Sequence, residues 1–362
     1  MESGALYQRG EVSPGQSFTP TRVSQVVRYF APSWFAAVMG TGVLTLGTAF
    51  LSRYYLPLGM IATVLHWFNV VLFLTLLVPW TLRWFIAGPQ ATAAMGHPVI
   101  GSFVPTVAIA LLVLATQFIQ VVQVPALAIL LWWCGVAMAF GFSFLILIWQ
   151  FTGDQVQLDH VTPGMFIPPV GLVVIPVAGA PLAASADAVV QGSMLLVCYV
   201  GLGSGILLWL SLQAITLFRL VLHKPITGQM APTFWINLGP LGVIPISLVA
   251  IAEASPFIAD KTPFLIAALL VWGFGIWWLV MAAMLTVLYW RRGELPFSLS
   301  WWAFTFPTGA FALASFRLSQ LLPLPGIFAV GAVAFLLLVL FWMATLMRSL
   351  KGALDGSLFQ PH

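Results

Sequence analysis

The chain has 362 residues, of which 61% are hydrophobic and 6% are charged, and its mean hydropathy is +1.05. Soluble domains carry about 25% charged residues, so this chain cannot cover a water-facing surface, and its composition excludes a soluble globular protein. The net charge of +4 indicates membrane topology rather than binding to nucleic acid. The sequence therefore predicts an all-α integral membrane protein.

Apolar stretches long enough to cross a bilayer, which takes about 20 helical residues, recur along the whole chain. We expect ten transmembrane helices, at residues 29–50, 59–85, 101–120, 124–151, 168–185, 191–221, 233–253, 262–290, 300–321 and 325–350. The fifth has the weakest signal, because prolines and glycines dilute its hydropathy. The loops are short, so we expect one transmembrane domain over 29–350, between an N-terminal segment, 1–28, and a C-terminal tail, 351–362.

The N-terminal segment is polar and lacks the apolar stretch of a signal peptide, so we expect no cleaved leader. Residues 21–29 fit a short interfacial helix and a disordered tail about equally well.

Basic residues are unevenly divided between the two ends of the predicted helices. Ten of the 13 fall at the end that holds both termini: Arg9, Arg22, Arg28, Arg83, Arg219, Lys224, Arg291, Arg292, Arg348 and Lys351. Arg53, Lys261 and Arg317 fall at the other end. Positive charge favours the cytoplasmic side, so we expect a multi-pass protein of the plasma (inner) membrane with both termini in the cytoplasm.

Five apolar segments broken by proline and glycine alternate with five unbroken ones. The breaks carry the motifs Phe30-Ala31-Pro32-Ser33-Trp34, Gly101-Ser102-Phe103-Val104-Pro105, Pro168-Pro169-Val170-Gly171, Asn237-Leu238-Gly239-Pro240 and Thr305-Phe306-Pro307-Thr308-Gly309. A proline inside a lipid-exposed helix frees a carbonyl that hydrocarbon cannot satisfy, so broken helices are best placed facing one another. We expect five helical hairpins, with an inner ring of kinked odd-numbered helices around a pore and an outer ring of even-numbered helices.

Residues that carry chemistry are scarce at membrane depth. All nine acidic residues lie outside the predicted helices or at their edges, whereas proton-coupled pumps usually carry a buried carboxylate or histidine relay. His66, the one histidine well inside a helix, is better explained as an amphipathic side chain near the interface or between helices. A b-type haem would need a pair of axial ligands at membrane depth, which one buried histidine does not supply, and the helices contain no H-E-x-x-H, C-x-x-C or G-x-S-x-G motif. We expect no enzymatic activity, no metal and no cofactor, and inert thiols at Cys134 and Cys198.

A pore without acids suits an anion, because carboxylates would repel it and fixed cations would hold it. The breaks offer unpaired N–H groups and the positive end of a half-helix dipole, which attract anions weakly. The candidate pore-lining residues are Gly40, Thr41, Gly42, Phe103, Pro105, Pro169, Gly171, Asn237, Gly239, Pro240, Thr305 and Pro307. Helix packing is the alternative interpretation, because small residues let membrane helices approach and Ser, Thr and Asn side chains cross-link them.

Phe306 precedes Pro307 at the break of the ninth helix. A phenyl ring in a narrow apolar pore would block ions by its volume and by dewetting. The chain has 28 Phe, most of which must face lipid or other helices, so position alone leaves packing as the alternative.

Two segments together resemble the tellurite-resistance/dicarboxylate transporter family, which includes bacterial TehA, plant guard-cell slow anion channels and fungal malic acid transporters. They are residues 32–42, Pro-Ser-Trp-Phe-Ala-Ala-Val-Met-Gly-Thr-Gly, and residues 301–307, Trp-Trp-Ala-Phe-Thr-Phe-Pro. The resemblance covers about 28–348. It implies ten helices in five hairpins, and a homotrimer whose subunits each contain a pore. It also implies a phenylalanine gate on the ninth helix, which matches Phe306, or Phe304 if the helix register differs.

The sequence thus favours a passive channel or uniporter for small anions, such as chloride, nitrate and C4-dicarboxylates including malate. The alternative is a proton-coupled C4-dicarboxylate or malate symporter or exporter, in which the substrate itself carries the proton. The expected partners are these anions, membrane lipid and further copies of the chain.

Overall fold

The structure is a computed structural model, and it describes residues 22–153 and 156–359. Every regular element in these ranges is helical, as the composition predicts. Five long unbroken helices form the outer layer: α3 (Pro57–Ile86), α6 (Pro125–Thr152), α9 (Ala188–Leu222), α11 (Thr262–Arg291) and α13 (Gly326–Asp355). Proline stands in the first turn of α3, α6 and α11, where its missing N–H costs no hydrogen bond.

The inner layer consists of five shorter helices, each of which begins as a 3₁₀ helix and continues as an α-helix. The pairs are η1 (Pro32–Trp34) with α2 (Phe35–Leu51), η2 (Gly101–Phe103) with α5 (Thr106–Gln120), η4 (Pro163–Phe166) with α7 (Ile167–Val173) and α8 (Ile175–Ala184), η5 (Gly228–Asn237) with α10 (Leu238–Ala254), and η6 (Leu299–Phe304) with α12 (Thr305–Leu321). The motifs that predict breaks therefore fall where the helix changes type.

Burial separates the two layers. Where apolar membrane-length windows occur, 78% to 89% of their residues are buried in the inner helices and 22% to 33% in the outer helices. The exposed face of each outer helix carries large apolar side chains, such as Leu207 on α9 and Leu270 on α11. The predicted inner and outer rings are thus confirmed.

The count of ten transmembrane helices is not confirmed in the same way. Among the described residues, nine helices are long and apolar enough to cross a membrane, and the predicted helix 300–321 is the one that falls short. Its place is taken by η6 and α12, which are largely buried and include Ser315 and Arg317. A helix surrounded by protein does not need the apolar surface that lipid requires, which explains its low hydropathy.

The inner helices close into a ring in chain order. Helix α2 contacts α5, α5 contacts α7 and α8, α8 contacts α10, α10 contacts α12, and α12 returns to contact α2. Each inner helix also contacts the outer helix that follows it in the chain. The repeat of five hairpins in the sequence is therefore a ring of five hairpins in space.

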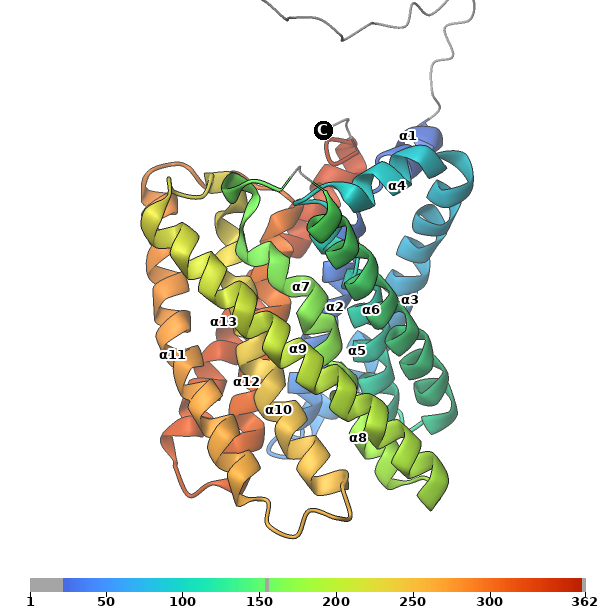
Figure 1. The fold of residues 1–362 in the computed structure, drawn as a ribbon, viewed down its shortest axis with the longest axis vertical. Coiled ribbons are helices and arrows are strands. Elements are labelled where there is room, and N and C mark those ends of the chain that lie inside the picture. The colour runs from blue at the N-terminus through green and yellow to red at the C-terminus, as the bar shows by residue number, and fades with distance from the viewer. Residues whose placement is uncertain (1–21, 154–155, 360–362) are drawn as a thin grey trace, which may run out of the picture.

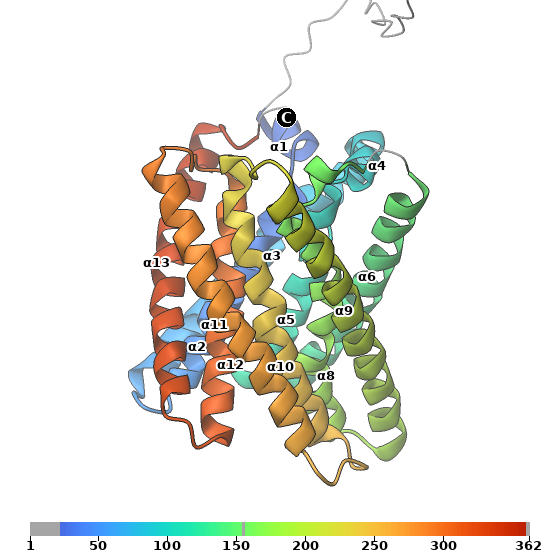
Figure 2. The ribbon, with the colours of Figure 1, turned by 60° about the vertical axis from the view of Figure 1, so that its left-hand side comes forward.

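One end of the molecule, here called the terminal end, holds both described chain ends. Helix α1 (Arg22–Arg28), the short helix α4 (Gly88–Gly96) and the C-terminal segment gather there (Figure 1), and a second view shows the same grouping (Figure 2). Helix α1 favours the interfacial-helix expectation for residues 21–29. Helix α4 was not expected, because its nine residues are too short and too weakly apolar to resemble a transmembrane helix.

The described part of the C-terminal tail, residues 351–359, continues the last helix and packs against the first inner helix. Helix α13 continues to Asp355, five residues beyond the expected end of the transmembrane domain, and Phe359 stacks on Trp34 of η1 with ring centroids 5.8 Å apart. The helix ends at Gly356, whose φ of 81° suits glycine at a helix C-terminus.

Candidate functional site

A small apolar cavity lies inside the ring, at the level of the transitions from 3₁₀ helix to α-helix. All five inner helices contribute to its wall, which consists of Ser33, Ala36, Met39, Phe103, Thr106, Ile109, Ile167, Val170, Ile236, Gly239, Leu299, Trp302, Ala303, Phe306 and Pro307. Its volume is about 30 Å³, enough for a water molecule. This wall contains no charged side chain.

The lining residues follow the helical period. Steps of three residues connect Ser33, Ala36 and Met39, and the same step recurs in the contributions of the other inner helices. Each helix therefore presents one stripe to the centre. Two of the lining residues are hydroxylic, and Thr106 donates to the backbone oxygen of Phe103 at 2.7 Å or of Pro32 at 2.8 Å. The polar atoms that face the centre are consequently few.

Phe306 fills one side of the cavity. Its side chain is 5% exposed, and its Cε1 atom lies 3.9 Å from the position that a Cβ atom on Gly239 would occupy. Val170 Cγ2 lies 3.8 Å from that same position. Because Gly239 has no side chain, the phenyl ring can approach the backbone of α10 directly, and the space between α10 and α12 is narrow.

Beyond Phe306, away from the terminal end, glycines bring α12 close to both of its neighbours in the ring. A Cβ atom on Gly242 of α10 would lie 2.5 Å from the Phe311 nitrogen on α12. A Cβ atom on Gly309 of α12 would meet Val43 of α2, with Val43 Cβ at 2.7 Å. Both distances are too short for real carbon contacts, so the glycines let α12 pack tightly against both neighbours.

Phe304, the other predicted gate residue, does not line the cavity. Its ring stacks on Phe341 of α13 at 5.0 Å and packs edge-on against Trp235 and Trp301 at 5.7 Å and 5.6 Å. It also borders a separate recess of about 250 Å³ between α11 and α13. The two phenylalanines therefore point in different directions, and Phe306 is the one that faces the centre.

Three of the predicted pore-lining residues, Phe103, Gly239 and Pro307, border the cavity. Gly40, Thr41 and Gly42 instead pack helices together. Gly40 makes room for the Thr305 side chain, and Gly42 for Val113 and Gln117. Thr41 accepts a 2.9 Å hydrogen bond from Trp342 Nε1 on α13. The helix-packing interpretation, rather than the pore-lining one, therefore fits the contacts of residues 40–42.

Further predicted residues lie behind the cavity wall. The carbonyl oxygen of Pro169 lies 2.8 Å from the Cβ position of Gly205 on α9, and the Cβ position of Gly171 is in ordinary contact with Ile109 and Ala139. Asn237 accepts a 2.8 Å hydrogen bond from Trp209 Nε1. The remaining three, Pro105, Pro240 and Thr305, are buried and do not border the cavity.

Sequence reasoning missed most of the wall. The missed residues are Ser33, Ala36, Met39, Thr106, Ile109, Ile167, Val170, Ile236, Leu299, Trp302 and Ala303. Most are plain apolar residues without a chemical signature. The signal that could have found them is the three-residue step counted from each 3₁₀ segment, because lining residues share one face of the helix.

At four of the five breaks, the first α-helical residue has a paired backbone N–H group. The first α-helical residue after the 3₁₀ segment donates to a carbonyl three residues earlier in four cases: Phe35 to Pro32, Ile167 to Gly164, Leu238 to Trp235 and Thr305 to Trp302. The transition changes the hydrogen-bonding pattern from the 3₁₀ type to the α-helical type, and these four N–H groups stay paired. These four N–H groups are therefore not free to bind an anion, and attraction of anions at the breaks stays a prediction.

His66 lies behind the wall as well. It is fully buried between α3 and α5, and its Nδ1 atom is 3.0 Å from Gln117 Oε1. Its ring packs edge-on against Phe118 with centroids 4.7 Å apart. The structure thus places His66 between helices, at a distance from the lining stripe, as the amphipathic interpretation predicts.

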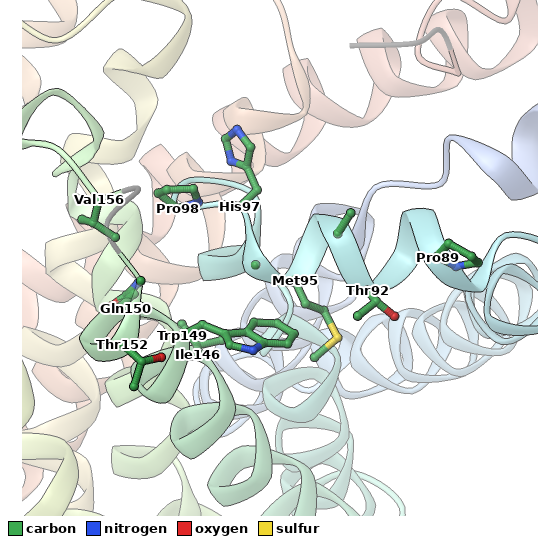
Figure 3. A pocket seen from close by; sticks show the side chains of 13 residues that line it. Pro89, Thr92, Met95, His97, Pro98, Ile146, Trp149, Gln150, Thr152 and Val156 are labelled. Atoms are coloured by element: carbon green, nitrogen blue, oxygen red, sulfur yellow. The ribbon is translucent and has the colours of Figure 1, made fainter. Parts of the chain in front are cut away.

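A larger cavity, of about 550 Å³, lies at the terminal end between α4 and α6 (Figure 3). Met95, His97 and Trp149 all line it, and the His97 ring points away from the other two side chains (Figure 3). The His97 Nδ1 atom accepts hydrogen bonds from the backbone N–H groups of Val99 and Ile100, each at 3.2 Å. Burial lowers the pKa of His97, and the nearby His160 adds to that lowering. This cavity touches none of the five lining stripes, so it is separate from the central one.

No group of three or more His, Cys, Asp or Glu side chains that could hold a metal ion occurs in the part of the chain that the structure describes.

The comparisons with known proteins agree with this architecture. Residues 29–350 match the family described as voltage-dependent anion channel, SLAC1. Uncharacterized transporter MJ0576 of Methanocaldococcus jannaschii is 40% identical, over 93% of this chain and 97% of the relative. Sulfite efflux pump SSU1 of Arthroderma benhamiae is 25% identical, over 91% of this chain and 92% of the relative. The malic acid transport protein of Schizosaccharomyces pombe is 22% identical, over 94% and 82%.

These matches confirm the family resemblance that residues 32–42 and 301–307 indicate. The chain belongs to the SLAC1 family of voltage-dependent anion channels.

Proposed function

We propose that this protein is a passive conduit for small anions, which pass through the ring of inner helices and are held back by the Phe306 side chain. The observation that carries the proposal is the position of Phe306. It lies in the wall to which all five inner helices contribute, and its ring approaches the backbone of α10 at Gly239. Rotation or displacement of this one phenyl ring would enlarge the cavity between the inner helices.

The lining supports passive movement. Its described side chains include no lysine or arginine, so an anion that enters is not held at the centre by a fixed charge. They include no carboxylate or histidine that would bind and release a proton in step with the substrate. A pore with these properties favours weak binding and rapid release.

We propose small inorganic anions and small carboxylates as the substrate class. Chloride, nitrate and malate are expected from the sequence, and sulfite joins them because a relative is named as a sulfite efflux pump. A cavity of about 30 Å³ is too small for malate, so the described conformation corresponds to a closed state. We further propose a plasma-membrane location with both termini in the cytoplasm, and a homotrimer with one pore per subunit.

Flux into proteoliposomes tests this proposal against the alternative of a proton-coupled symporter. That alternative is relevant because one relative is named as a malic acid transport protein. Purified protein is reconstituted, and uptake of radiolabelled malate, nitrate and sulfite is followed at fixed voltage with and without a pH gradient. We expect each anion to move only down its electrochemical gradient, and the final distribution to follow the voltage. Accumulation of malate that depends on an imposed proton gradient, at zero voltage, would instead establish the symporter.

A further inference from the structure

Helix α9 carries a stripe of polar side chains toward the terminal end. Trp209, Gln213, Thr216 and Arg219 follow one another at steps of four, three and three residues, so they share one face of the helix. All four are buried, and Arg219 is 3% exposed. Arginine is almost never fully buried unless it is paired, so this stripe requires an explanation.

The polar atoms on this stripe lack protein partners. Across the described residues, no hydrogen-bond partner exists for Arg219 Nε and Nη1, for the Thr216 hydroxyl, or for either polar atom of the Gln213 amide, although all are buried. Each carries the cost of lost hydration, and that cost is highest for the charged guanidinium. A ligand that accepts hydrogen bonds from these donors would remove much of it.

The local charge is also unbalanced. Asp159 interacts electrostatically with Arg219, but its two oxygens already bind other groups. One lies 2.5 Å from His223 Nε2 and the other 2.8 Å from Lys224 Nζ. Hydrogen bonds from Lys224 and His223 lower the pKa of Asp159, so its carboxylate is charged at neutral pH. One carboxylate therefore interacts with two permanent cations, Lys224 and Arg219.

We propose that Gln213, Thr216 and Arg219, here called the α9 polar stripe, bind one oxyanion at the terminal end of α9, where this helix contacts η4. A guanidinium offers paired N–H donors that match two oxygens of a phosphate, sulfate or sulfite group. The Thr216 hydroxyl and the Gln213 amide lie one and two helical turns away on the same face and supply further contacts. The ligand is either a free oxyanion or the phosphate of an anionic phospholipid, because the chemistry is the same.

This site is distinct from the proposed conduit. None of its three residues borders the central cavity. The α9 polar stripe nevertheless lies close to the central cavity. Trp209, on the same face of α9, donates a hydrogen bond to Asn237 of η5, and the nearby residues Ile236 and Gly239 line the cavity. An oxyanion bound here would fix the terminal end of α9, so binding should be visible as stabilisation of the fold whether or not the conduit proposal is correct.

Thermal unfolding of the purified protein in detergent tests the proposal. Lipid is first removed by washing, and the unfolding midpoint is measured against increasing sulfate and phosphate at constant ionic strength. We expect a saturable rise for the wild type, because a ligand that binds only the folded state stabilises it. Arg219→Gln should abolish the rise. The control variant Arg348→Gln removes an exposed arginine of α13 that also lies toward the terminal end. It should show the same rise as the wild type.

A second variant and a direct measurement cover the case in which Arg219→Gln does not fold. Thr216→Val keeps the shape of the side chain and removes one donor to a charged ligand, so the apparent affinity should fall by about tenfold. In wild-type crystals grown with selenate, an anomalous selenium peak beside the Arg219 guanidinium is expected.

The source of the ligand is resolved by mass spectrometry of the intact protein before washing. A co-purified phospholipid that is retained by the wild type and lost in Thr216→Val identifies the lipid phosphate, whereas a lipid-free protein that responds to sulfate identifies a free anion. The proposal is overturned if sulfate and phosphate leave the midpoint unchanged, no phospholipid is retained and the selenate map shows only water. It is equally overturned if Arg219→Gln folds and responds as the wild type does.

Discussion

At the scale of single residues, neighbouring positions in one motif have different roles. Gly239 and Gly242 lie three residues apart on α10, yet the first borders the cavity and the second is pressed against the backbone of α12. Residues three apart share one face of a helix, so the difference arises from how closely α12 approaches each of the two positions. Small residues serve a pore and a helix contact equally well, so their identity alone does not reveal which role applies.

This difference predicts opposite results for two alanine substitutions. A methyl group at Gly242 would collide with backbone atoms of Ala310 and Phe311, which cannot move without shifting α12, so Gly242→Ala should destabilise the protein by about 1–3 kcal/mol. A methyl group at Gly239 would make ordinary contacts at 3.8 Å and 3.9 Å, so Gly239→Ala should fold normally. Thermal unfolding in detergent compares the two. Equal stability of both variants with the wild type would contradict the proposed packing of α10 on α12.

The choice between Phe306 and Phe304 shows how much of the site can be predicted from single residues in the sequence. Nothing in the chemistry of one phenylalanine among 28 separates it from Phe304. The family resemblance selected it, and the structure then places it in the cavity wall and Phe304 in an aromatic cluster with Phe341. The Gly40, Thr41 and Gly42 motif was equally prominent in the sequence, but its contacts are with other helices.

At the scale of helices, the prolines predicted the right segments but not their geometry. The sequence indicated breaks, and the structure shows a change from 3₁₀ helix to α-helix at the same places. Such a change keeps the backbone hydrogen-bonded, which a membrane interior requires. The sequence could not reveal this, because proline disrupts the α-helical pattern in either case.

The lining stripe predicts which positions on α2 react with a water-soluble thiol reagent. Cys134 and Cys198 are first replaced by alanine, in the Phe306→Ala background that enlarges the cavity. Ala36→Cys and Met39→Cys should react, because both positions border the cavity. Val38→Cys should not, because Val38 is fully buried and outside the stripe. Reaction is followed by mass spectrometry, and labelling of Val38→Cys as fast as Met39→Cys would show that the stripe is misassigned.

At the scale of the whole molecule, the order of the sequence repeat is also the order of the ring. Hairpins that follow one another in the chain are neighbours in space, and the fifth returns to the first through the contact between α12 and α2. The repeat predicted an inner and an outer layer, because broken helices avoid lipid. Closure of the ring around a cavity of about 30 Å³ depends on the packing of individual glycines and phenyl rings, which periodicity alone does not encode.

The central claim is that Phe306 closes a continuous path along the ring. Ionic current through planar bilayers tests it most directly, with the wild type, Phe306→Ala and the matched control Phe304→Ala recorded in symmetrical chloride and nitrate. We predict that Phe306→Ala conducts at least about tenfold more current than the wild type, since removal of the ring widens an apolar constriction. Phe304→Ala should conduct like the wild type, because its ring packs against α13. Unchanged current in a folded Phe306→Ala protein, or an equal gain in Phe304→Ala, would contradict the claim.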